Sequence, residues 1–276
     1  MTYSAFAPPS LPAPGTPLYK PVTRLRTLFP TLDQQLFDSQ SLSQLTAKLA
    51  IMHDFPYSEK ILALLPLTDT SKCLHQLVIT EENLYLVDRS QEYILNQAFL
   101  FHEHVPYNQL FKQALSQVLN KQNKTYNAPM PTWRYVLMSL KASRLWAGNR
   151  IWLSPEILVE NTKENDGTQV LRTLLGLSLI SPVTPETLRS NLKQACLCHG
   201  LLLRMHKTRL PRNSDKLQTF LGYPSLPLVN RVLEKLEFRH IPGQREELMT
   251  CYKKLATKQA VQDFIDAEER ALARRK

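Results

Sequence analysis

Two short stretches of the sequence carry residue types that could bind a metal or act in catalysis. The first, Cys196-Leu197-Cys198-His199, supplies two thiols and an imidazole. Structural zinc sites usually place about two to four residues between paired cysteines, and a Cys-x-Cys pair on a helix points its thiols about 200° apart. We therefore predict that Cys196 and Cys198 pack in the core. The sequence predicts no metal site and no other cofactor.

The second stretch, 101–105, has the sequence Phe-His-Glu-His-Val and places His102 and His104 on one side of an extended chain. Such a pair can chelate a metal, but no third ligand lies nearby and the H-E-x-x-H motif is absent. Histidines of this kind are more often surface or helix-end residues, so we predict that the protein is not an enzyme. A pocket that gathers His102, Glu103 and His104 would favour an enzyme instead.

The glycines exclude three large classes of enzyme. The chain has 276 residues and only seven glycines, of which Gly167 and Gly176 lie closest in sequence. This spacing accommodates neither the G-x-G-x-x-G motif, nor the P-loop, nor the G-x-S-x-G nucleophile elbow. Dinucleotide-binding, P-loop and α/β-hydrolase functions are therefore excluded.

Positive charge is concentrated in the central third of the chain. The formal net charge is +10, from 34 basic and 24 acidic side chains. Residues 104–214 hold 15 basic and 5 acidic side chains, whereas residues 1–103 hold 7 and 10. The stretches 104–155 and 187–214 contain no carboxylate side chain. A surface of this sign attracts polyanions, so we predict a nucleic-acid partner, with duplex DNA preferred.

The apolar pattern predicts a mainly α-helical α+β fold in three parts. Residues 1–21 contain six prolines, which predicts a disordered, extended arm. Residues 22–125 are predicted to form a helical N-terminal domain with one β-hairpin at 77–87, and 61–65 is read as part of a helix. Residues 126–276 are predicted to form a basic winged-helix-like domain that begins with a helix over 133–145.

The winged-helix prediction depends on the helix that begins at Thr184-Pro185-Glu186. A hydroxyl, a proline and a carboxylate in this order are typical of a helix N-terminus, and the same order recurs at Ser154. We expect the helix to end near Gly200, followed by a strand over 201–205 and a basic loop over 206–213. Further helices are expected at 215–221, at 228–238 and from 244 onward, the last with its apolar stripe buried.

In this interpretation the helix enters the major groove and the loop lies on the phosphate backbone as a wing. The residues predicted to read bases are Arg189, Asn191, Lys193 and Gln194. The residues predicted to hold phosphates are Arg204, Lys207, Arg209 and Arg212. The predicted function is DNA binding by a transcriptional regulator or a replication initiator.

A second class of function remains open. The alternative is a non-catalytic adaptor or effector whose basic face binds an acidic protein or a membrane surface. A homodimer or a protein partner would be bound through the N-terminal region. Charges interrupt every stretch near the ~20 residues of a membrane span, and residues 1–11 lack the features of a secretory signal. We therefore expect a cytoplasmic protein with no membrane span.

Overall fold

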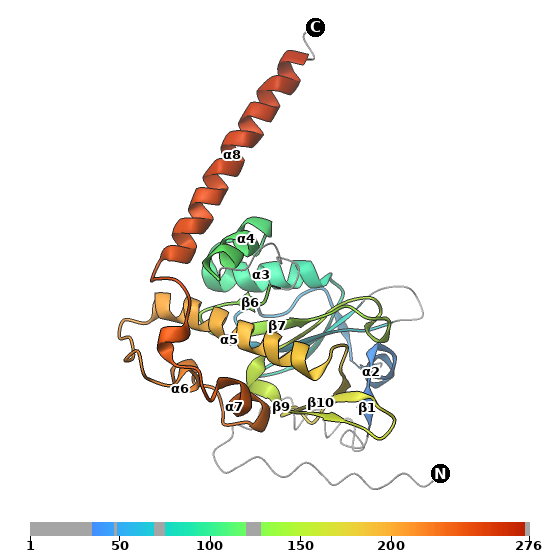
Figure 1. Ribbon diagram of the computed structural model, residues 1–276. Coiled ribbons are helices and arrows are strands. Elements are labelled where there is room, and N and C mark those ends of the chain that lie inside the picture. The colour runs from blue at the N-terminus through green and yellow to red at the C-terminus, as the bar shows by residue number, and fades with distance from the viewer. Residues whose placement is uncertain (1–34, 47–48, 69–74, 120–127, 274–276) are drawn as a thin grey trace.

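The computed structural model describes residues 35–46, 49–68, 75–119 and 128–273 (Figure 1). Within these ranges the strands form two mixed sheets, one of seven strands and one of four. The predicted proline-rich arm at 1–21 lies outside the described residues.

The seven-stranded sheet joins segments from both halves of the chain. Its first pair of strands is parallel and the other pairs are antiparallel. In spatial order the strands are β2 (Ile51–Met52), β5 (Leu84–Val87), β4 (Gln76–Thr80), β3 (Ile61–Pro66), β8 (Ile151–Leu153), β7 (Val136–Leu140) and β6 (Met130–Pro131). Ala63 of β3 lies opposite Leu153 of β8. The predicted domain boundary at residue 126 stays a prediction. The pairing of β3 with β8 crosses this boundary.

Three strands of the four-stranded sheet follow the larger sheet in sequence, and its edge strand β1 comes from the N-terminal part of the chain. In spatial order its strands are β1 (Leu36–Phe37), β11 (Ser178–Ile180), β10 (Gln169–Thr173) and β9 (Leu158–Lys163). The indole of Trp146, in the connection from β7 to β8, is fully buried and donates its Nε1–H to the Ile180 carbonyl at 3.0 Å. This bond ties the larger sheet to the smaller one.

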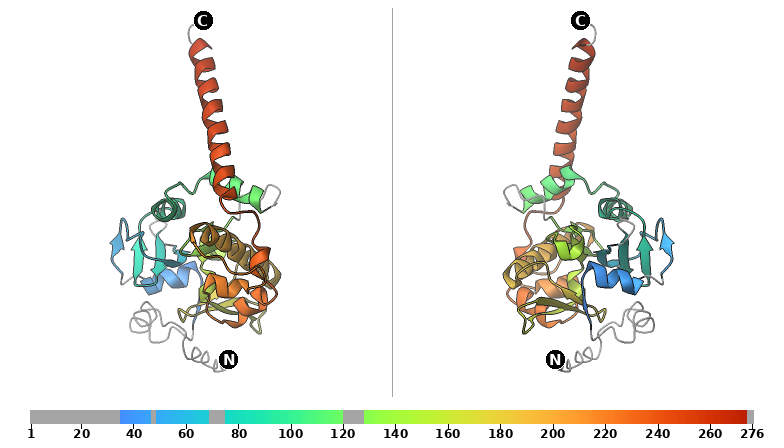
Figure 2. Two further views of the ribbon diagram at one scale, coloured as in Figure 1. Left: turned by 90° about the vertical axis from the view of Figure 1, so that its left-hand side faces the viewer. Right: turned by 90° about the vertical axis from the view of Figure 1, so that its right-hand side faces the viewer.

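The helices cover the sheets and extend beyond them (Figures 1 and 2). Their bounds are α2 (Ser39–Thr46), α3 (Gln91–Glu103), α4 (Gln109–Val118), α5 (Pro185–His206), α6 (Leu217–Leu221), α7 (Pro227–Leu233) and α8 (Glu247–Ala273). Short 3₁₀ helices occupy Arg144–Trp146, Pro155–Ile157 and Phe238–His240. α5 packs on β7, α6 and α7 pack against α5, and the start of α8 packs on α4.

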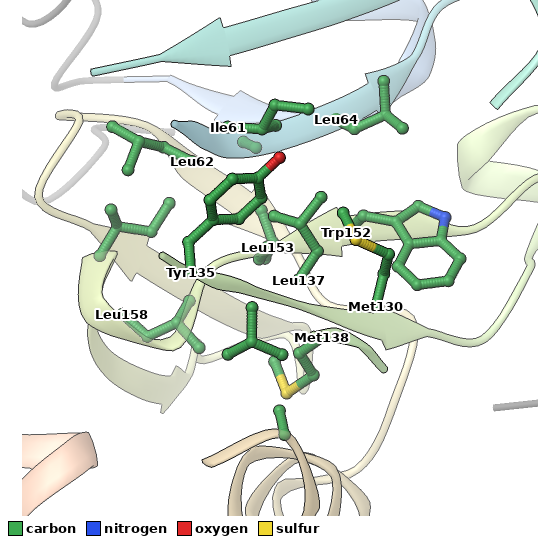
Figure 3. Packing of buried hydrophobic residues seen from close by; sticks show 14 of the residues in the cluster. Ile61, Leu62, Leu64, Met130, Tyr135, Leu137, Met138, Trp152, Leu153 and Leu158 are labelled. Carbon is green, nitrogen blue, oxygen red and sulfur yellow. The ribbon is translucent and has the colours of Figure 1, made fainter. Parts of the chain in front are cut away.

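The core between β3 and its neighbours is built from large apolar side chains (Figure 3). Tyr135 points toward β3, where its ring lies beside Ile61 and Leu62. Met138 points to the opposite side, toward α5, which packs on β7. β3 and β7 consist of buried residues throughout, as is typical of strands in the interior of a sheet that is covered on both faces.

The predicted fold class is wrong in both halves. The N-terminal part is not a helical region with one hairpin, because it contributes β1 to β5 to the two sheets. The C-terminal part is not winged-helix-like, because α5 continues through 201–205, where a strand was expected, and no strand follows it in the described chain. The hairpin predicted at 77–87 is confirmed as β4 and β5.

Two predicted helices are strands for the same physical reason. Residues 61–65 belong to β3, and the central part of 133–145 forms β7. A short run of apolar residues is compatible with a buried helix or a buried strand, and periodicity cannot distinguish them. Here β3 pairs with β8, which is distant in sequence, and β7 pairs with its sequence neighbours β6 and β8, so strand pairing and not periodicity decides the outcome.

Two of the predicted helix boundaries are wrong because their signals have another cause. Gly200 does not end α5. A Cβ atom at this position would meet the Ile241 side chain at 2.9 Å, so the glycine permits close packing within a continuing helix. At Ser154 the expected helix is only the 3₁₀ helix Pro155–Ile157, and the chain then enters β9. At α5 the prediction is confirmed, since the Thr184 hydroxyl accepts from the Thr187 N–H.

Candidate nucleic-acid interface

The four predicted base-reading residues lie on the N-terminal half of α5. Arg189 and Lys193 are one turn apart and exposed to solvent. Asn191 is half-buried and donates its Nδ2–H to the Ser139 carbonyl at 3.3 Å, and Gln194 is also half-buried. The Nδ2 group of Asn191 is therefore engaged within the fold, whereas Arg189 and Lys193 present their charges to solvent.

A surface pocket of about 670 Å³ lies at the start of α5. Lys141, Thr184 and Asn191 are among the residues that line it. The Thr184 hydroxyl already caps the helix, and Pro185 at the first helical position has no N–H to offer an anion. Two of the backbone positions with which a helix N-terminus usually holds a phosphate are therefore not available at this pocket.

The side chain of Arg204 is part of the packing rather than of the surface. It is 8% exposed, and its Nη2 donates to the carbonyls of Pro242 at 2.9 Å and Gly243 at 2.7 Å. Pro242 and Gly243 lie in the loop that leads into α8. Arg204 thus fixes this loop against the C-terminal end of α5, where it cannot reach a phosphate.

Replacing Arg204 with methionine is expected to lower the free energy of unfolding by about 2 kcal/mol. The substitution keeps the apolar stem but removes two charge-assisted hydrogen bonds and leaves two carbonyls without this donor. Urea unfolding followed by circular dichroism would measure the change. The exposed Arg209, replaced in the same way, serves as the control and should change stability by less than about 0.5 kcal/mol. Equal effects at the two positions would contradict the assignment.

Lys207 is also engaged with its neighbours. Its Nζ lies 4.8 Å from the centre of the Phe220 ring and donates to the Phe220 carbonyl at 3.2 Å. The Lys207 ammonium group is therefore held against Phe220 of α6, and its charge stays fixed at this position.

Two segments that are distant in sequence meet next to α6 through backbone hydrogen bonds. The Arg239 N–H donates to the Asn213 carbonyl at 3.2 Å, and the Phe238 N–H donates to the Asp215 carbonyl at 2.8 Å. Lys216 forms a β-bridge with Glu237. The loop after α5 and the segment after α7 are therefore held side by side.

Five cationic side chains on these two segments are exposed, and we call them the basic patch. They are Arg209, Arg212, Lys216, Lys235 and Arg239. Arg209 and Arg212 were predicted from the sequence, whereas the other three were missed. They lie beyond residue 214, where acidic residues balance most of the charge, and no local signal marks them. Lys216 follows the predicted loop closely in sequence, whereas only the pairing of the two segments brings Lys235 and Arg239 next to that loop.

Three carboxylates lie within the same two segments and reduce the charge of the basic patch only in part. The Asp215 side chain accepts from the Arg212 backbone N–H at 2.8 Å, and Glu237 lies 2.8 Å from the Arg239 guanidinium. Arg239 nevertheless keeps a side-chain exposure of 64%. The third carboxylate, that of Glu234, is exposed to solvent. The backbone carbonyl of Glu234 accepts a hydrogen bond from the Lys216 ammonium at 2.9 Å. Positive charge remains in excess.

The eight predicted residues fall into two separate places. Lys193 and His206, the last residue of α5, are 13 residues apart, which corresponds to about 20 Å along a helix. Arg189 and Lys193 therefore lie about 20 Å or more from the start of the loop that carries Arg209 and Arg212. The basic patch includes Arg209 and Arg212 but not Arg204 or Lys207, and Arg189 and Lys193 stand apart from it.

The histidine stretch 101–105 directs its side chains into different surroundings. His102 is buried, and its ring meets the Tyr135 ring edge to face at 5.4 Å. Glu103 accepts from the Trp133 backbone N–H at 2.6 Å and lies 3.3 Å from His206. His104 is exposed at the left-handed end of α3. No grouping of three metal-ligating side chains occurs among the described residues.

The cysteines of α5 lie in the core, as predicted. Cys196 and Cys198 are both fully buried among apolar side chains. Burial raises the pKa of the Cys196 thiol well above its ordinary value, and the neighbouring Cys198 adds to this effect. The thiol therefore stays protonated and unreactive at neutral pH.

No known protein family, no curated protein and no solved structure matches this chain. None of the helices in the described ranges has the length and apolar character needed to cross a bilayer. The geometry of the chain's own residues is therefore the basis for inferring its function.

Proposed function

We propose that the basic patch binds the phosphate backbone of duplex DNA without reading base edges. The observation that carries this proposal is the meeting of five exposed cations on two segments joined by backbone hydrogen bonds. Each lysine or arginine near a phosphate releases condensed counterions, which favours binding to any sequence. Fixed backbone positions also reduce the conformational entropy that the binding surface must lose.

We propose contacts to the DNA phosphate backbone alone because α5 offers few side chains that could reach the bases. One face of α5 is buried, and the amide of Asn191 bonds to Ser139. Base readout requires several side chains that reach into the major groove together. Binding is therefore expected to be in the micromolar range typical of sequence-independent complexes, about 10⁻⁴–10⁻⁶ M.

The double substitution Arg209→Ala and Arg212→Ala is expected to weaken DNA binding about tenfold and to reduce the salt slope by about 2. The reason is that each lost phosphate contact removes about 0.9 from the slope of log K against log salt. Fluorescence anisotropy with a labelled duplex of mixed sequence, measured between about 50 and 200 mM salt, gives both quantities. The matched control is Arg144→Ala with Lys163→Ala, which removes two exposed cations from other elements.

The comparison between the two pairs of substitutions decides the outcome. The control pair should leave the affinity within about twofold of the starting protein, because long-range charge effects are screened over about 8–10 Å. If both pairs weaken binding equally, the net charge of the protein and not the basic patch attracts DNA. If neither pair changes the affinity, the proposal is wrong.

A further inference from the structure

Helix α8 projects away from the body of the protein along much of its length (Figures 1 and 2). Its first turns are anchored, since Leu248 is buried and Tyr252 and Leu255 pack against the core. From Thr257 to Ala271 its residues are exposed, apart from Asp266, which is half-buried. About 20 Å of helix therefore stands free of the body in the described structure.

The free part of α8 carries large apolar side chains. Val261 is 55% exposed, Phe264 is 67% exposed and Ile265 is 43% exposed. The sequence predicted that Phe264 and Ile265 continue the buried stripe of Leu248, Tyr252 and Leu255, and this expectation is wrong. Leu255 and Val261 are six residues apart, which places them about 120° apart around the helix. The exposed apolar face therefore points away from the contact with the body.

Val261 and Ile265 belong to a stripe of α8 that has the spacing of a coiled-coil seam, with Phe264 beside it. Along it lie Lys254, Lys258, Val261, Ile265 and Glu268, at alternating steps of four and three residues. The apolar residues occupy the middle, basic residues lie at one end, and an acidic residue lies at the other. Neither Lys254 nor Glu268 forms an ion pair with another described residue.

We propose that α8 pairs with α8 of a second copy of this chain in an antiparallel arrangement. With Val261 opposite Val261 of the second copy, Lys254 comes opposite Glu268 of that copy, and the same pair recurs at the other end. A parallel arrangement would instead place lysine opposite lysine and glutamate opposite glutamate. The order of charges along the seam thus favours a second copy in the antiparallel direction.

The antiparallel pair is also compatible with the shape of the molecule. A two-fold axis near Val261 makes the contact isologous, so the same surface serves both copies. The two bodies then lie at opposite ends of the paired helices, since each body is attached at the N-terminal end of its own α8. The paired segment from Lys254 to Glu268 spans about 20 Å, which predicts a small contact and a weak, reversible dimer.

Sedimentation of the full chain tests the apolar part of the contact. The unsubstituted protein is expected to change from monomer to dimer over a concentration range of about 10–300 μM, as befits a small interface. The double substitution Val261→Asp and Ile265→Asp is expected to abolish this change. The matched control, Ala260→Asp with Ala267→Asp, adds two charges to the same exposed helix but off the seam and should leave dimerisation within about threefold. Circular dichroism verifies that all variants keep the same helix content.

Charge reversal tests the antiparallel direction. Lys254→Glu alone and Glu268→Lys alone are each expected to weaken the dimer about tenfold, because each creates two like-charge contacts. The double substitution in one chain should restore it, and an equimolar mixture of the two single variants should form a heterodimer. A parallel pair predicts no weakening by either single substitution.

Three outcomes would overturn the proposal. The first is a chain that stays monomeric across the whole concentration range. The second is a dimer that persists after the Val261 and Ile265 substitutions. The third is a monomeric chain that sediments with anionic lipid vesicles through the same apolar face, which would assign that face to a membrane surface.

Discussion

Replacing Lys60 with methionine is expected to lower the free energy of unfolding by about 3–5 kcal/mol. The Lys60 ammonium lies 2.5 Å from Glu156, where the end of the loop before β3 meets the 3₁₀ helix before β9. The Glu156 side chain is only 6% exposed and the Lys60 side chain is 18% exposed. Removing the lysine would leave a carboxylate buried without its counter-charge. Chemical unfolding at neutral pH measures the change.

The double substitution Lys60→Met with Glu156→Leu distinguishes a buried charge from general disruption of the site. Once both charges are removed, no uncompensated carboxylate remains, so most of the lost stability should return. A double variant that is less stable than Lys60→Met alone would contradict this account. It would indicate that Glu156 contributes chiefly through contacts other than its pairing with Lys60.

Lowering the pH from 7 to 4 is expected to reduce the free energy of unfolding by about 3–6 kcal/mol through two buried histidines. Burial lowers the pKa of His102 to about 4, with a smaller effect from the nearby Arg134 charge. Burial also lowers the pKa of His199 to about 3, and the Lys60 charge contributes. Both rings are therefore neutral in the folded protein at neutral pH.

The sign follows from comparing the two states. In the unfolded chain each histidine takes up a proton near pH 6.5, whereas in the folded chain it does so only near pH 3–4. The stabilising contribution is therefore complete above about pH 6.5 and is lost as the pH falls toward 4. Glu103 acts in the opposite sense, because burial raises its pKa and protonation relieves a buried charge.

Urea unfolding of several variants, measured at several pH values, distinguishes the contribution of the histidines to the fall in stability from that of the carboxylates. His102→Gln and His199→Gln should each flatten the fall in stability between pH 6.5 and 4.5, whatever their effect at pH 7. The exposed His53, replaced by glutamine, is the control and should leave the slope unchanged. An unaltered slope in both buried variants would show that other groups cause the acid sensitivity.

Local signals predicted some elements correctly because their causes lie within a few residues. The hydroxyl of Thr184 accepts from the Thr187 N–H, so this helix start depends on residues only three positions apart. The β4–β5 hairpin is formed by neighbouring strands around a short polar turn, and its register needs no distant partner. Burial of Cys196 and Cys198 was likewise predicted from residue type, because free cysteines are among the most buried residues.

The rest depended on contacts that no local pattern contains. The apolar run of β3 became a central strand because β8, which is distant in sequence, pairs with it, and β7 in turn pairs with β8. Arg204 was read as a surface cation, yet the carbonyls of Pro242 and Gly243 hold it within the fold.

The amino-acid sequence by itself determined the excess of positive charge, the absence of glycine-rich nucleotide-binding motifs and several helix starts, since these are properties of composition and of neighbouring residues. Tertiary structure alone decided which cations share a surface. Lys235 and Arg239 join Arg209 and Arg212 only through backbone bonds between segments more than 20 residues apart. It also decided that α8 leaves the body with Phe264 and Ile265 exposed, because burial depends on what the rest of the chain places against a helix face.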